Sequence, residues 1–412
     1  MKVDIVAQSD TAGGAARASF RLHKAFLNSA LVESEMLVVR KFSDLNSVHC
    51  ALSKQEIFSN ILCNLIEKKI VSFHKTDNPV LHSANFFGSN LLSKINESSA
   101  EITNLHWCNH NALSIKQIAK IQKPIVMTLH DMWAFCGGEH YVDNYREHDI
   151  IYKRGKISNF NQSFSNKFDL NKSIWNRKRK YWGNDMTIVT PSDWLTQCAA
   201  ESELFGNSKV FTIPNALDTN LYRPLCKDFS RSIFNIDDNK KIIGFGALGG
   251  GTDLRKGFDL LKDALKSIEH KGDYRCVVFG QSKPRVMPDI GLPVEFIGHL
   301  NDDITLSLFY NTLDVMVVPS RLEAFGQTAS EAQSCGVPVV AFDTTGLKDV
   351  VSHGMTGYLA KVFDVKDLAC GIEWCTGEDN PQLKLNARKR AVKLWSQDVV
   401  TQSYLKVFNQ LQ

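Results

Sequence analysis

The sequence predicts an α/β protein with two Rossmann-like domains, each built on a doubly wound parallel sheet. Its 412 residues exceed one ordinary core and suffice for two domains. Hydrophobic residues make up 43% and charged residues 22% of the chain, the composition of a globular protein. Short apolar runs alternate with longer amphipathic segments throughout, which is typical of parallel sheets covered by helices.

The first half begins this alternation with short runs rich in Val and Ile. The expected strands are VDIVAQ from Val3, SEMLVVR from Ser34, ITNLHWC from Ile102, PIVMTLH from Pro124, MTIVTP from Met186 and KVFTIPN from Lys209. Helical patterns follow Gly14 and Lys54, where apolar residues recur at helical spacing.

The second half repeats the alternation of short apolar runs and longer amphipathic segments. The expected strands are KIIGFGAL, RCVVFG, VEFIGHL, LDVMVVPS and PVVAFD. Helices are expected after Arg255, Asp302 and Gly326. Strands this rich in Val and Ile are buried on both faces, which predicts parallel sheets with right-handed crossovers.

Two polar stretches interrupt the pattern. The segment 217–240, which contains Arg-Pro, is expected to link the domains, and 137–169 is expected to be a long irregular excursion. The predicted domains are therefore 1–217 and 218–395, followed by a C-terminal helical segment at 396–412.

Charge and cysteine usage restrict the functional class. A net charge of +4 gives no general basic surface, so no nucleic-acid role is expected. The start, MKVDIVAQSD, lacks the apolar region of an export signal, and no run approaches about 18 uncharged apolar residues. The ten cysteines form no Cys-x-x-Cys pair, so reduced thiols and a cytoplasmic location are expected.

The loop SDTAGGAARAS follows the first strand. Gly13 and Gly14 let the backbone approach a ligand, and the helix that opens beyond them presents amides and a partial positive charge. The alternative is a tight strand-to-helix turn without a ligand.

A second unusual loop is TLHDMWAFCGG. His130 ends a strand, where parallel sheets place ligand-binding side chains, and Asp131 and Trp133 follow it. A lone histidine at a strand end is often structural, but its place beside other unusual loops favours a role in the site.

The loop FGALGGGTDLRKGFDLL has three glycines followed by Arg255 and Lys256. Cations before a helix neutralise a diphosphate, although solvated charges capping a loop remain the alternative. The loop lacks the Lys-Ser/Thr ending of a P-loop, so a nucleoside triphosphatase is not expected.

The stretch SRLEAFGQTASEAQSCGVP places two carboxylates around a helix start. The helix is expected to begin at Gly326 or Gln327, so the amides around Phe325 form an anion site. Glu323 precedes that site and Glu331 follows it. A carboxylate accepts two hydrogen bonds from a ribose diol or a sugar, but Glu331 also suits a purely structural place in the helix.

A basic aromatic segment, KSIWNRKRKYWGN, allows two interpretations. At helical spacing, one face gathers Ile174, Trp175, Lys178, Tyr181 and Trp182, flanked by Arg177, Arg179 and Lys180. Residues 172–182 then either contact an anionic membrane surface or pack on the N-terminal sheet through their aromatics.

Together these features resemble retaining glycosyltransferases of the GT-B fold, family four, of the type that builds surface polysaccharides, O-antigen and colanic acid. The shared features are IPNALD, RKG after a glycine loop, IGHL before an acidic helix start, VVPSRLEAFGQTASEAQSCGVPVVAFDTTGLKDVV, and GMTGYL. HDMWAFCGGEHY is similar to the colanic acid and O-antigen branch, although the further cysteines common in that branch are missing.

The resemblance implies a nucleotide sugar, UDP- or GDP-linked, in a cleft between two domains. Glu331 would bind the ribose, and the amides near Phe325 and Gly326 with Lys256 would bind the diphosphate. Glu323 would lie at the transferred sugar's reacting face, and His130 would contact that sugar.

Several further expectations follow from the family. Gly13 and Gly14 would line the acceptor and phosphate side, and the last helix would cross back to the N-terminal domain. Many members carry an arginine several residues before the lysine, whereas here the nearest is Arg255, which leaves its role as phosphate ligand open.

The implied chemistry is hexosyl transfer to a lipid-linked or oligosaccharide acceptor with retention of configuration. No Asp-x-Asp occurs in the chain, so no metal and no other cofactor are expected. Glu323 as a covalent nucleophile is an alternative to same-face attack assisted by the leaving phosphate. A catalytically silent scaffold subunit and a GT-B sugar-nucleotide epimerase are the rival functions.

Overall fold

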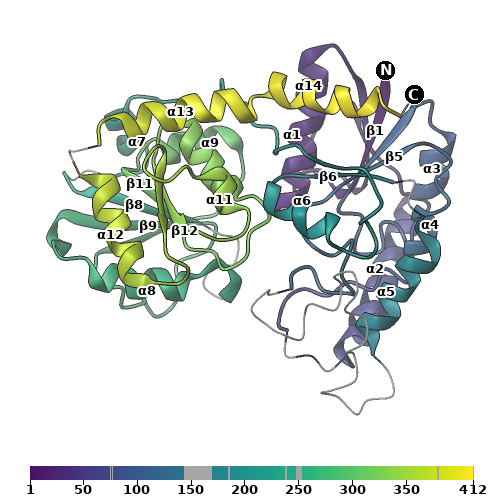
Figure 1. Cartoon of the computed structure of the whole chain (residues 1–412), viewed down its shortest axis with the longest axis horizontal. Coiled ribbons are helices and arrows are strands. Elements are labelled where there is room, and N and C mark those ends of the chain that lie inside the picture. The colour runs from purple at the N-terminus through teal and green to yellow at the C-terminus, as the bar shows by residue number, and fades with distance from the viewer. Residues whose placement is uncertain are drawn as a thin grey trace. The chain divides into compact units, whose positions relative to one another are not determined.

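The computed structural model describes every residue except 75, 77, 143–168, 184–185, 237–238, 247–252, 378–379 and 412. The chain forms two compact units (Figure 1). Unit 1 comprises Met1–Pro214 and Thr401–Gln412, and unit 2 is Asn215–Val400. Most of the excursion predicted at 137–169 lies outside the described residues.

Unit 1 is built on a seven-stranded parallel sheet with the order β3-β2-β1-β4-β5-β6-β7. Its strands are β1 (Lys2–Ser9), β2 (Glu33–Arg40), β3 (Val48–Cys50), β4 (Ile102–His106), β5 (Ile125–Thr128), β6 (Thr187–Thr190) and β7 (Val210–Thr212). Its helices are α1 (Gly14–Ser29), α2 (Lys54–Ser72), α3 (Leu91–Glu97), α4 (Ile115–Ile118), α5 (Leu170–Tyr181) and α6 (Asp193–Ala200). The six strands predicted for this half are present, and β3 was not predicted.

Unit 2 has a six-stranded parallel sheet with the order β10-β9-β8-β11-β12-β13. Its strands are β8 (Lys241–Gly246), β9 (Tyr274–Phe279), β10 (Val294–Gly298), β11 (Val315–Val318), β12 (Val339–Phe342) and β13 (Gly357–Ala360). Its helices are α7 (Lys227–Ile233), the 3₁₀ turns η3 (Leu254–Lys256) and η4 (Lys271–Asp273), α8 (Phe258–Ser267), α9 (Asp303–Tyr310), α10 (Gln327–Ser334), α11 (Leu347–Val350), α12 (Val365–Thr376) and α13 (Gln382–Trp395). The final helix, α14 (Gln397–Phe408), begins in this unit and ends in unit 1.

The two sheets share one topology. In unit 1 the strand order reverses between β1 and β4, and in unit 2 it reverses between β8 and β11. The central strands are buried along their length, with β11 and β12 buried at every position, because helices cover both faces. Loops after the strands flanking such a reversal diverge and leave room for a ligand. The predicted doubly wound architecture of both units is confirmed.

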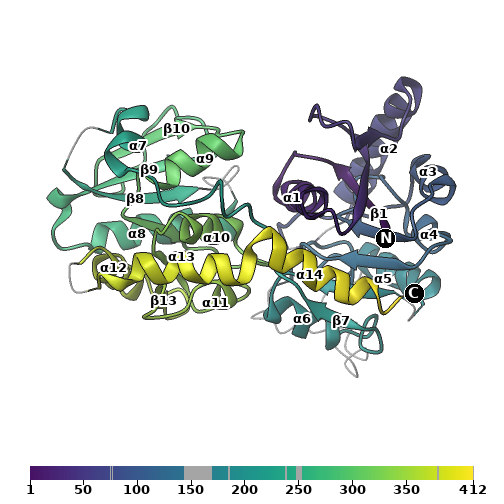
Figure 2. The ribbon, with the colours of Figure 1, turned by 90° about the horizontal axis from the view of Figure 1, so that it is seen from above.

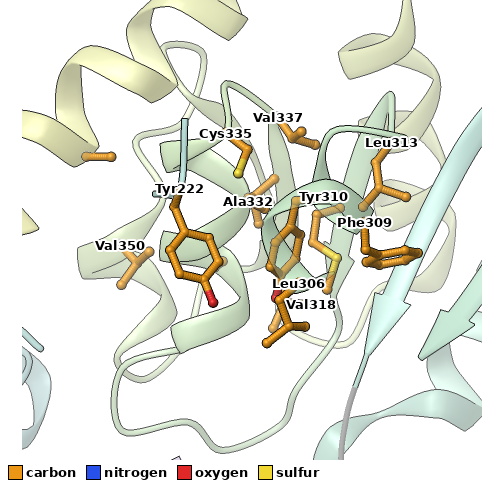
Figure 3. Close-up of a cluster of buried hydrophobic side chains, with 14 of the residues drawn as sticks. Tyr222, Leu306, Phe309, Tyr310, Leu313, Val318, Ala332, Cys335, Val337 and Val350 are labelled. Atoms are coloured by element: carbon orange, nitrogen blue, oxygen red, sulfur yellow. The ribbon is translucent and has the colours of Figure 1, made fainter. Parts of the chain in front are cut away.

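The segment 217–240 is not a linker. Leu217, Tyr222 and Ile236 are buried in the core of unit 2, and α7 lies within the segment. Figure 3 shows Tyr222 among the buried side chains around Tyr310. Although the segment is polar on average, its few apolar residues are enough to fix it in the core.

Residues 401–412 complete the core of unit 1. The ring of Phe26 on α1 meets Tyr404 and Phe408 edge-on, with centroids 5.8 and 5.9 Å apart. The hydroxyls of Tyr404 and Thr128 lie 3.1 Å apart at the end of β5. Figure 2 shows α14 lying along unit 1.

Among the described helices, none combines the length and apolar character that crossing a bilayer requires.

Candidate functional site

Two loops of unit 2 meet at the point where its strand order reverses. The loop after β8 leads to η3, and the loop after β11 leads to α10. Because β8 and β11 are neighbours, their carboxyl ends bring Lys256 and Glu323 together. The glycines predicted to line this loop fall within 247–252 and lie outside the described residues.

Lys256 and Glu323 form a close ion pair. The Lys256 Nζ atom donates to Glu323 Oε2 at 2.7 Å, and Arg255 Nη1 lies 3.8 Å from the same oxygen. The side chains of both cations are 22% exposed and that of Glu323 is 15% exposed. Burial raises the pKa of Glu323, but the charges of Lys256 and Arg255 outweigh it and hold that pKa below its ordinary value. The carboxylate is therefore ionised at neutral pH and lies beside two cations.

Backbone and side-chain bonds tie these two loops to each other. Arg321, after β11, donates its amide to the carbonyl of Arg255 at 2.8 Å. Its guanidinium binds both carboxylate oxygens of Asp259 at 2.8 and 2.6 Å. Gly257 has φ +70°, and a Cβ there would lie 1.9 Å from the carbonyl oxygen of Pro319. The close approach of the loops therefore depends on a residue without a side chain.

α10 begins at Gln327, as the sequence predicts, and Gly326 precedes it with φ +95°. The start of a helix carries a partial positive charge, so the backbone at the start of α10 can bind an anion. The Phe325 ring is 4% exposed and meets Trp395 edge-on. Only the backbone of Phe325 is thus placed for an anion site.

Glu331 lies on the second turn of α10 and is 4% exposed. The Tyr310 hydroxyl donates to Glu331 Oε2 at 2.6 Å. Tyr310 is itself fully buried in the core of unit 2 (Figure 3), so it fixes the orientation of the carboxylate. A buried carboxylate with a fixed orientation suits the recognition of hydroxyl groups.

In unit 1, Gly13 and Gly14 follow β1. Gly13 precedes α1 with φ +99°, and a Cβ built on it would meet no described atom within 4 Å. Asp10 accepts hydrogen bonds from the amides of Phe42 and Ser43 at 2.8 to 3.1 Å, which fixes the turn. The glycine is thus required by its backbone conformation, while open space lies beside it.

His130 is half-buried just beyond β5 and pairs with a second histidine. Its Nε2 atom lies 2.9 Å from Nδ1 of His106, the last residue of β4. Burial lowers the pKa of His130 to about 4, although Asp131 acts in the opposite direction. Burial also lowers the pKa of His106 far below its ordinary value, helped by His130. Both rings are therefore neutral at pH 7, and one donates to the other.

The adjacent carboxylate, Asp131, organises the rest of this loop. It accepts hydrogen bonds from Trp107 Nε1 at 2.9 Å and His140 Nδ1 at 2.6 Å. His140 Nε2 lies 2.9 Å from the Ser83 hydroxyl. Burial raises the pKa of Asp131, but the charge and hydrogen bond of His140 lower it overall. Asp131 is therefore a structural anchor for the loop that carries His130.

Lys178, on α5, also contacts this loop. Its fully buried ammonium donates to the carbonyls of Trp133, Cys136 and Gly137 and lies 3.8 Å from the centre of the Trp133 ring. Burial lowers the pKa of Lys178 to about 7. This lysine thus binds the turn after His130 from the side of α5.

The aromatic face of α5 lies inside unit 1. Trp175 is 5% and Trp182 is 7% exposed, and Arg177 donates to the carbonyls of Ala84 and Asn85. Of the two interpretations of 172–182, packing through the aromatics is observed. The contact of this segment with a membrane stays a prediction.

The predicted site residues therefore fall into two groups. Glu323, Arg255 and Lys256 contact one another, while Gly326, Gln327 and Glu331 follow on α10 of the same unit. Gly13, Gly14 and His130 belong to unit 1. Sequence reasoning missed His106 and Tyr310. His106 is the last residue of β4 and His130 lies just beyond the end of β5, so the criterion of a position at a strand end identifies both, whereas nothing local marks Tyr310.

The part of the chain that the structure describes has no group of three or more His, Cys, Asp or Glu side chains arranged as metal ligands.

Most of unit 2 is similar in sequence to a known protein family. Residues 227–392 match the family model described as Glycosyl transferases group 1. The capsular polysaccharide biosynthesis glycosyltransferase CapM of Staphylococcus aureus is 32% identical over 160 residues, which cover 38% of this chain and 39% of CapM. An uncharacterized 41.2 kDa protein in the cps region of Klebsiella pneumoniae is 30% identical over 178 residues, 43% of this chain and 48% of that protein. The chain spans about half or less of the length of the curated relatives it matches.

The likeness of the folds extends over the whole chain. The crystal structure of HepE from Anabaena in complex with UDP and glucose superimposes with a TM-score of 0.64, covers 100% of both chains and is 20% identical. At this identity the likeness concerns the fold, and it confirms the predicted GT-B class.

Proposed function

Because residues 227–392 belong to the family Glycosyl transferases group 1, we propose that the chain transfers a sugar from a nucleotide-diphosphate donor to a glycan acceptor. The similarity to CapM and to a cps-region protein supports a role in synthesis of a bacterial surface polysaccharide. The HepE structure contains UDP and glucose, which supports a UDP-sugar as donor, with a GDP-sugar as the alternative. The proposed reaction is hexosyl transfer with retention of anomeric configuration.

The observation that carries this proposal is the ion pair of Lys256 with Glu323 beside the start of α10. Cleavage of the bond between the anomeric carbon and the diphosphate builds positive charge on the sugar and negative charge on the leaving group. Lys256, Arg255 and the first amides of α10 would stabilise that leaving group. Glu323, ionised between the cations, would face the sugar on which positive charge develops.

Glu331 would bind the ribose of the nucleotide. Its carboxylate is held by Tyr310 at 2.6 Å, so little conformational freedom is lost when it accepts hydrogen bonds from a diol. Gln327, the first residue of α10, would add its amide to the diphosphate site.

The unit 1 residues would act on the sugar and the acceptor. A neutral His130 can donate or accept a hydrogen bond with a sugar hydroxyl, and His106 would hold its ring in place. The open space at Gly13, next to Gly14 at the start of α1, suits the close approach of an acceptor or phosphate oxygen.

We further propose same-face attack assisted by the leaving phosphate, without a metal ion. Lys256 and Arg255 supply the positive charge that a metal would bring. Glu323 as a covalent nucleophile is disfavoured because its Oε2 atom is already engaged by Lys256 at 2.7 Å, with Arg255 3.8 Å away.

A lipid-linked acceptor, met at the cytoplasmic face of the membrane, completes the proposal. The exposed cations of the predicted contact segment 172–182 are Lys172, Arg179 and Lys180. With the aromatics of α5 packed inside, this segment could contribute charge only.

The proposal is favoured over its two rivals. A silent scaffold would have no need for a buried Glu331 oriented by Tyr310, or for the Lys256–Glu323 pair. A GT-B epimerase would share the nucleotide site, so only product analysis separates it from a transferase.

Nucleotide binding by Glu331 variants is the decisive test. Glu331→Gln keeps the side-chain volume but removes the charge, and Glu331→Ala removes the carboxylate. We expect each to weaken binding of the preferred nucleotide about 10- to 100-fold, since hydrogen bonds to charged groups contribute about 1.5–3 kcal/mol. The preferred nucleotide is found by thermal shift with UDP-, GDP- and dTDP-sugars, and affinities are then measured by calorimetry in EDTA.

His130→Ala is the matched control. It should leave nucleotide affinity within about twofold of the wild type and lower sugar transfer at least 100-fold. Wild-type affinity in both Glu331 variants would refute the ribose assignment. Loss of binding on adding EDTA would refute the metal-free site.

A further inference from the structure

The two ring nitrogens of His106 lie in different surroundings. This histidine ends β4 and is 1% exposed, and its Nδ1 atom lies 2.9 Å from Nε2 of His130, so the two rings share one hydrogen bond. Its Nε2 atom is also buried, but no atom of the described residues forms a hydrogen bond with it. One nitrogen of His106 thus has a partner, and the other has none in the part of the chain that the structure describes.

The neighbours of His106 in the sheet account for the isolated Nε2 atom. Its register partners are Ala7 on β1 and Thr128 on β5. Alanine has no polar side chain. The Thr128 hydroxyl already donates to Asn104 Oδ1 at 2.9 Å and lies 3.1 Å from the Tyr404 hydroxyl. Neither register partner therefore bonds to His106 Nε2.

This asymmetry determines where the protons of the histidine pair lie. Because burial lowers the pKa of both rings, each ring is neutral and carries one proton. The bond between the rings then has two possible directions, with either His106 Nδ1 or His130 Nε2 as the donor. If His130 were the donor, the proton of His106 would lie on the isolated Nε2 atom, and a buried N–H group without an acceptor is strongly disfavoured. Donation by His106 leaves only a bare nitrogen at that position.

His82 has the arrangement that we infer for His106. Its Nδ1 atom lies 2.7 Å from the carbonyl oxygen of Val80, which can only accept, so the proton of His82 is on Nδ1. Burial lowers the pKa of His82, so its ring is also neutral. Its bare Nε2 atom is buried without a partner among the described residues. The same unit thus already buries one bare ring nitrogen.

We propose that His106 fixes the tautomer of His130. His106 donates its Nδ1 proton to Nε2 of His130, so His130 carries its own proton on Nδ1. Because the His130 ring is only half-buried, Nδ1 is the nitrogen left for a ligand, and it acts as a hydrogen-bond donor. The group that fits it is an oxygen lone pair, which belongs to the transferred sugar if the proposed function holds. His106 is then a positioning residue that acts through His130.

Nuclear magnetic resonance of protein made with isotope-labelled histidine tests the tautomers, since the chemical shift of a ring nitrogen shows whether it carries a proton. At about pH 8, above the ordinary pKa of histidine, His106 and His130 should each show a protonated Nδ1 and a bare Nε2. His82 is the internal reference for this tautomer. His353 is the reference for the opposite one, since its Nδ1 atom accepts the amide of Leu359 at 3.0 Å. A proton on Nε2 of His130 would overturn the proposal.

His106→Leu tests the positioning role. Without the donor, His130 should become a mixture of both tautomers, and kcat for sugar transfer should fall about tenfold while nucleotide affinity stays within about twofold of the wild type. His23→Gln changes a buried histidine of unit 1 outside the site and should alter neither the His130 spectrum nor kcat. An unchanged His130 spectrum in folded His106→Leu would contradict the proposal.

Thermal unfolding identifies a variant that fails to fold, and the wild-type spectra then decide alone. The spectra also separate this proposal from the proposed function, because they require no activity. A wild-type protein that transfers no sugar would refute the proposed function, while the proton positions in His106 and His130 would still decide the tautomer.

Discussion

At the scale of single residues, unit 1 buries several histidines that stay neutral. His23 is fully buried between the hydroxyls of Ser34 and Ser47, each 2.8 Å from a ring nitrogen. Burial lowers the pKa of His23 to about 4, and His49 lowers it further. The same direction holds for His110 and His130, whose pKa values are lowered to about 4. The folded protein thus binds fewer protons than the unfolded chain between pH 4 and 6.5.

This difference predicts an acid-sensitive unit 1. Stability is complete above pH 6.5, the pKa of unfolded histidine, and is lost as pH falls towards 4, because protons bind preferentially to the unfolded chain. His23 alone should account for about 2 kcal/mol of the loss between pH 7 and 5. The measurement is urea unfolding of the wild type and His23→Gln at both pH values.

The His23→Gln variant should lose less stability on acidification than the wild type, whatever its stability at pH 7. Equal losses in the two proteins would contradict the role of His23.

Some residues of the candidate site could be predicted from the local sequence, and others could not. Glu323, Lys256 and the start of α10 follow from positions after strands, because parallel topology brings the ends of adjacent strands together. His106 and Tyr310 contact site residues that lie 24 and 21 positions further along the chain, respectively, which no local pattern encodes. The sequence placed Lys178 on the aromatic face of its helix, but a sequence does not show the three carbonyls that bind its ammonium.

At the scale of elements, the turn between η3 and α8 determines how closely the loops after β8 and β11 approach. Gly257 combines φ +70° with a space too small for a Cβ, which would lie 1.9 Å from a backbone oxygen. The adjacent residue, Lys256, carries the ion pair with Glu323.

Gly257→Ala should therefore destabilise unit 2 by about 2–4 kcal/mol, from left-handed backbone strain and the clash. We also expect weaker nucleotide binding, because the loop must move away from β11. Gly272→Ala is the control, since a Cβ there meets no described atom within 4 Å. Thermal unfolding measures the stability of the two variants, and calorimetric titration measures their nucleotide affinity. Equal stability and equal affinity of Gly257→Ala and Gly272→Ala would contradict the proposed packing.

Element prediction succeeded where burial dominates. Strands such as β11 and β12 consist of apolar residues, mostly valine, that are buried at every position, and they carry a strong signal. β3 has only three residues, two of them exposed, and β13 spans four residues that begin with a glycine, so neither shows the pattern of a buried strand. Periodicity also identified α2, but the spacing of apolar residues cannot show that the polar side faces the protein.

At the scale of the whole molecule, the chain passes between its two units twice, after Pro214 and after Val400. The domain boundaries expected from the sequence, 217/218 and 395/396, stay predictions. The second passage occurs inside α14, so one helix belongs to both units. Its last part supplies Tyr404, Val407 and Phe408 to the core of unit 1.

Phe408→Ala should thus destabilise unit 1 although it lies at the far end of the sequence. Removing a fully buried aromatic ring in contact with Phe26 and Tyr404 should cost about 3–5 kcal/mol. Differential scanning calorimetry should show a lower transition for unit 1 and an unchanged one for unit 2. The exposed neighbour Lys406→Ala should change neither transition, and an unaltered unit 1 transition in Phe408→Ala would contradict this packing.

Unit 1 consists of two segments that are distant in the sequence, and this affects how the protein folds during synthesis. During synthesis, residues 401–412 leave the ribosome only after all of unit 2, so unit 1 lacks part of its core until this segment has emerged. Unit 2 is continuous in sequence and can fold while unit 1 still waits for its last helix. An isolated fragment 1–214 would expose Phe26 to water, whereas a circular permutant that joins 401–412 directly to unit 1 would give each unit an uninterrupted sequence.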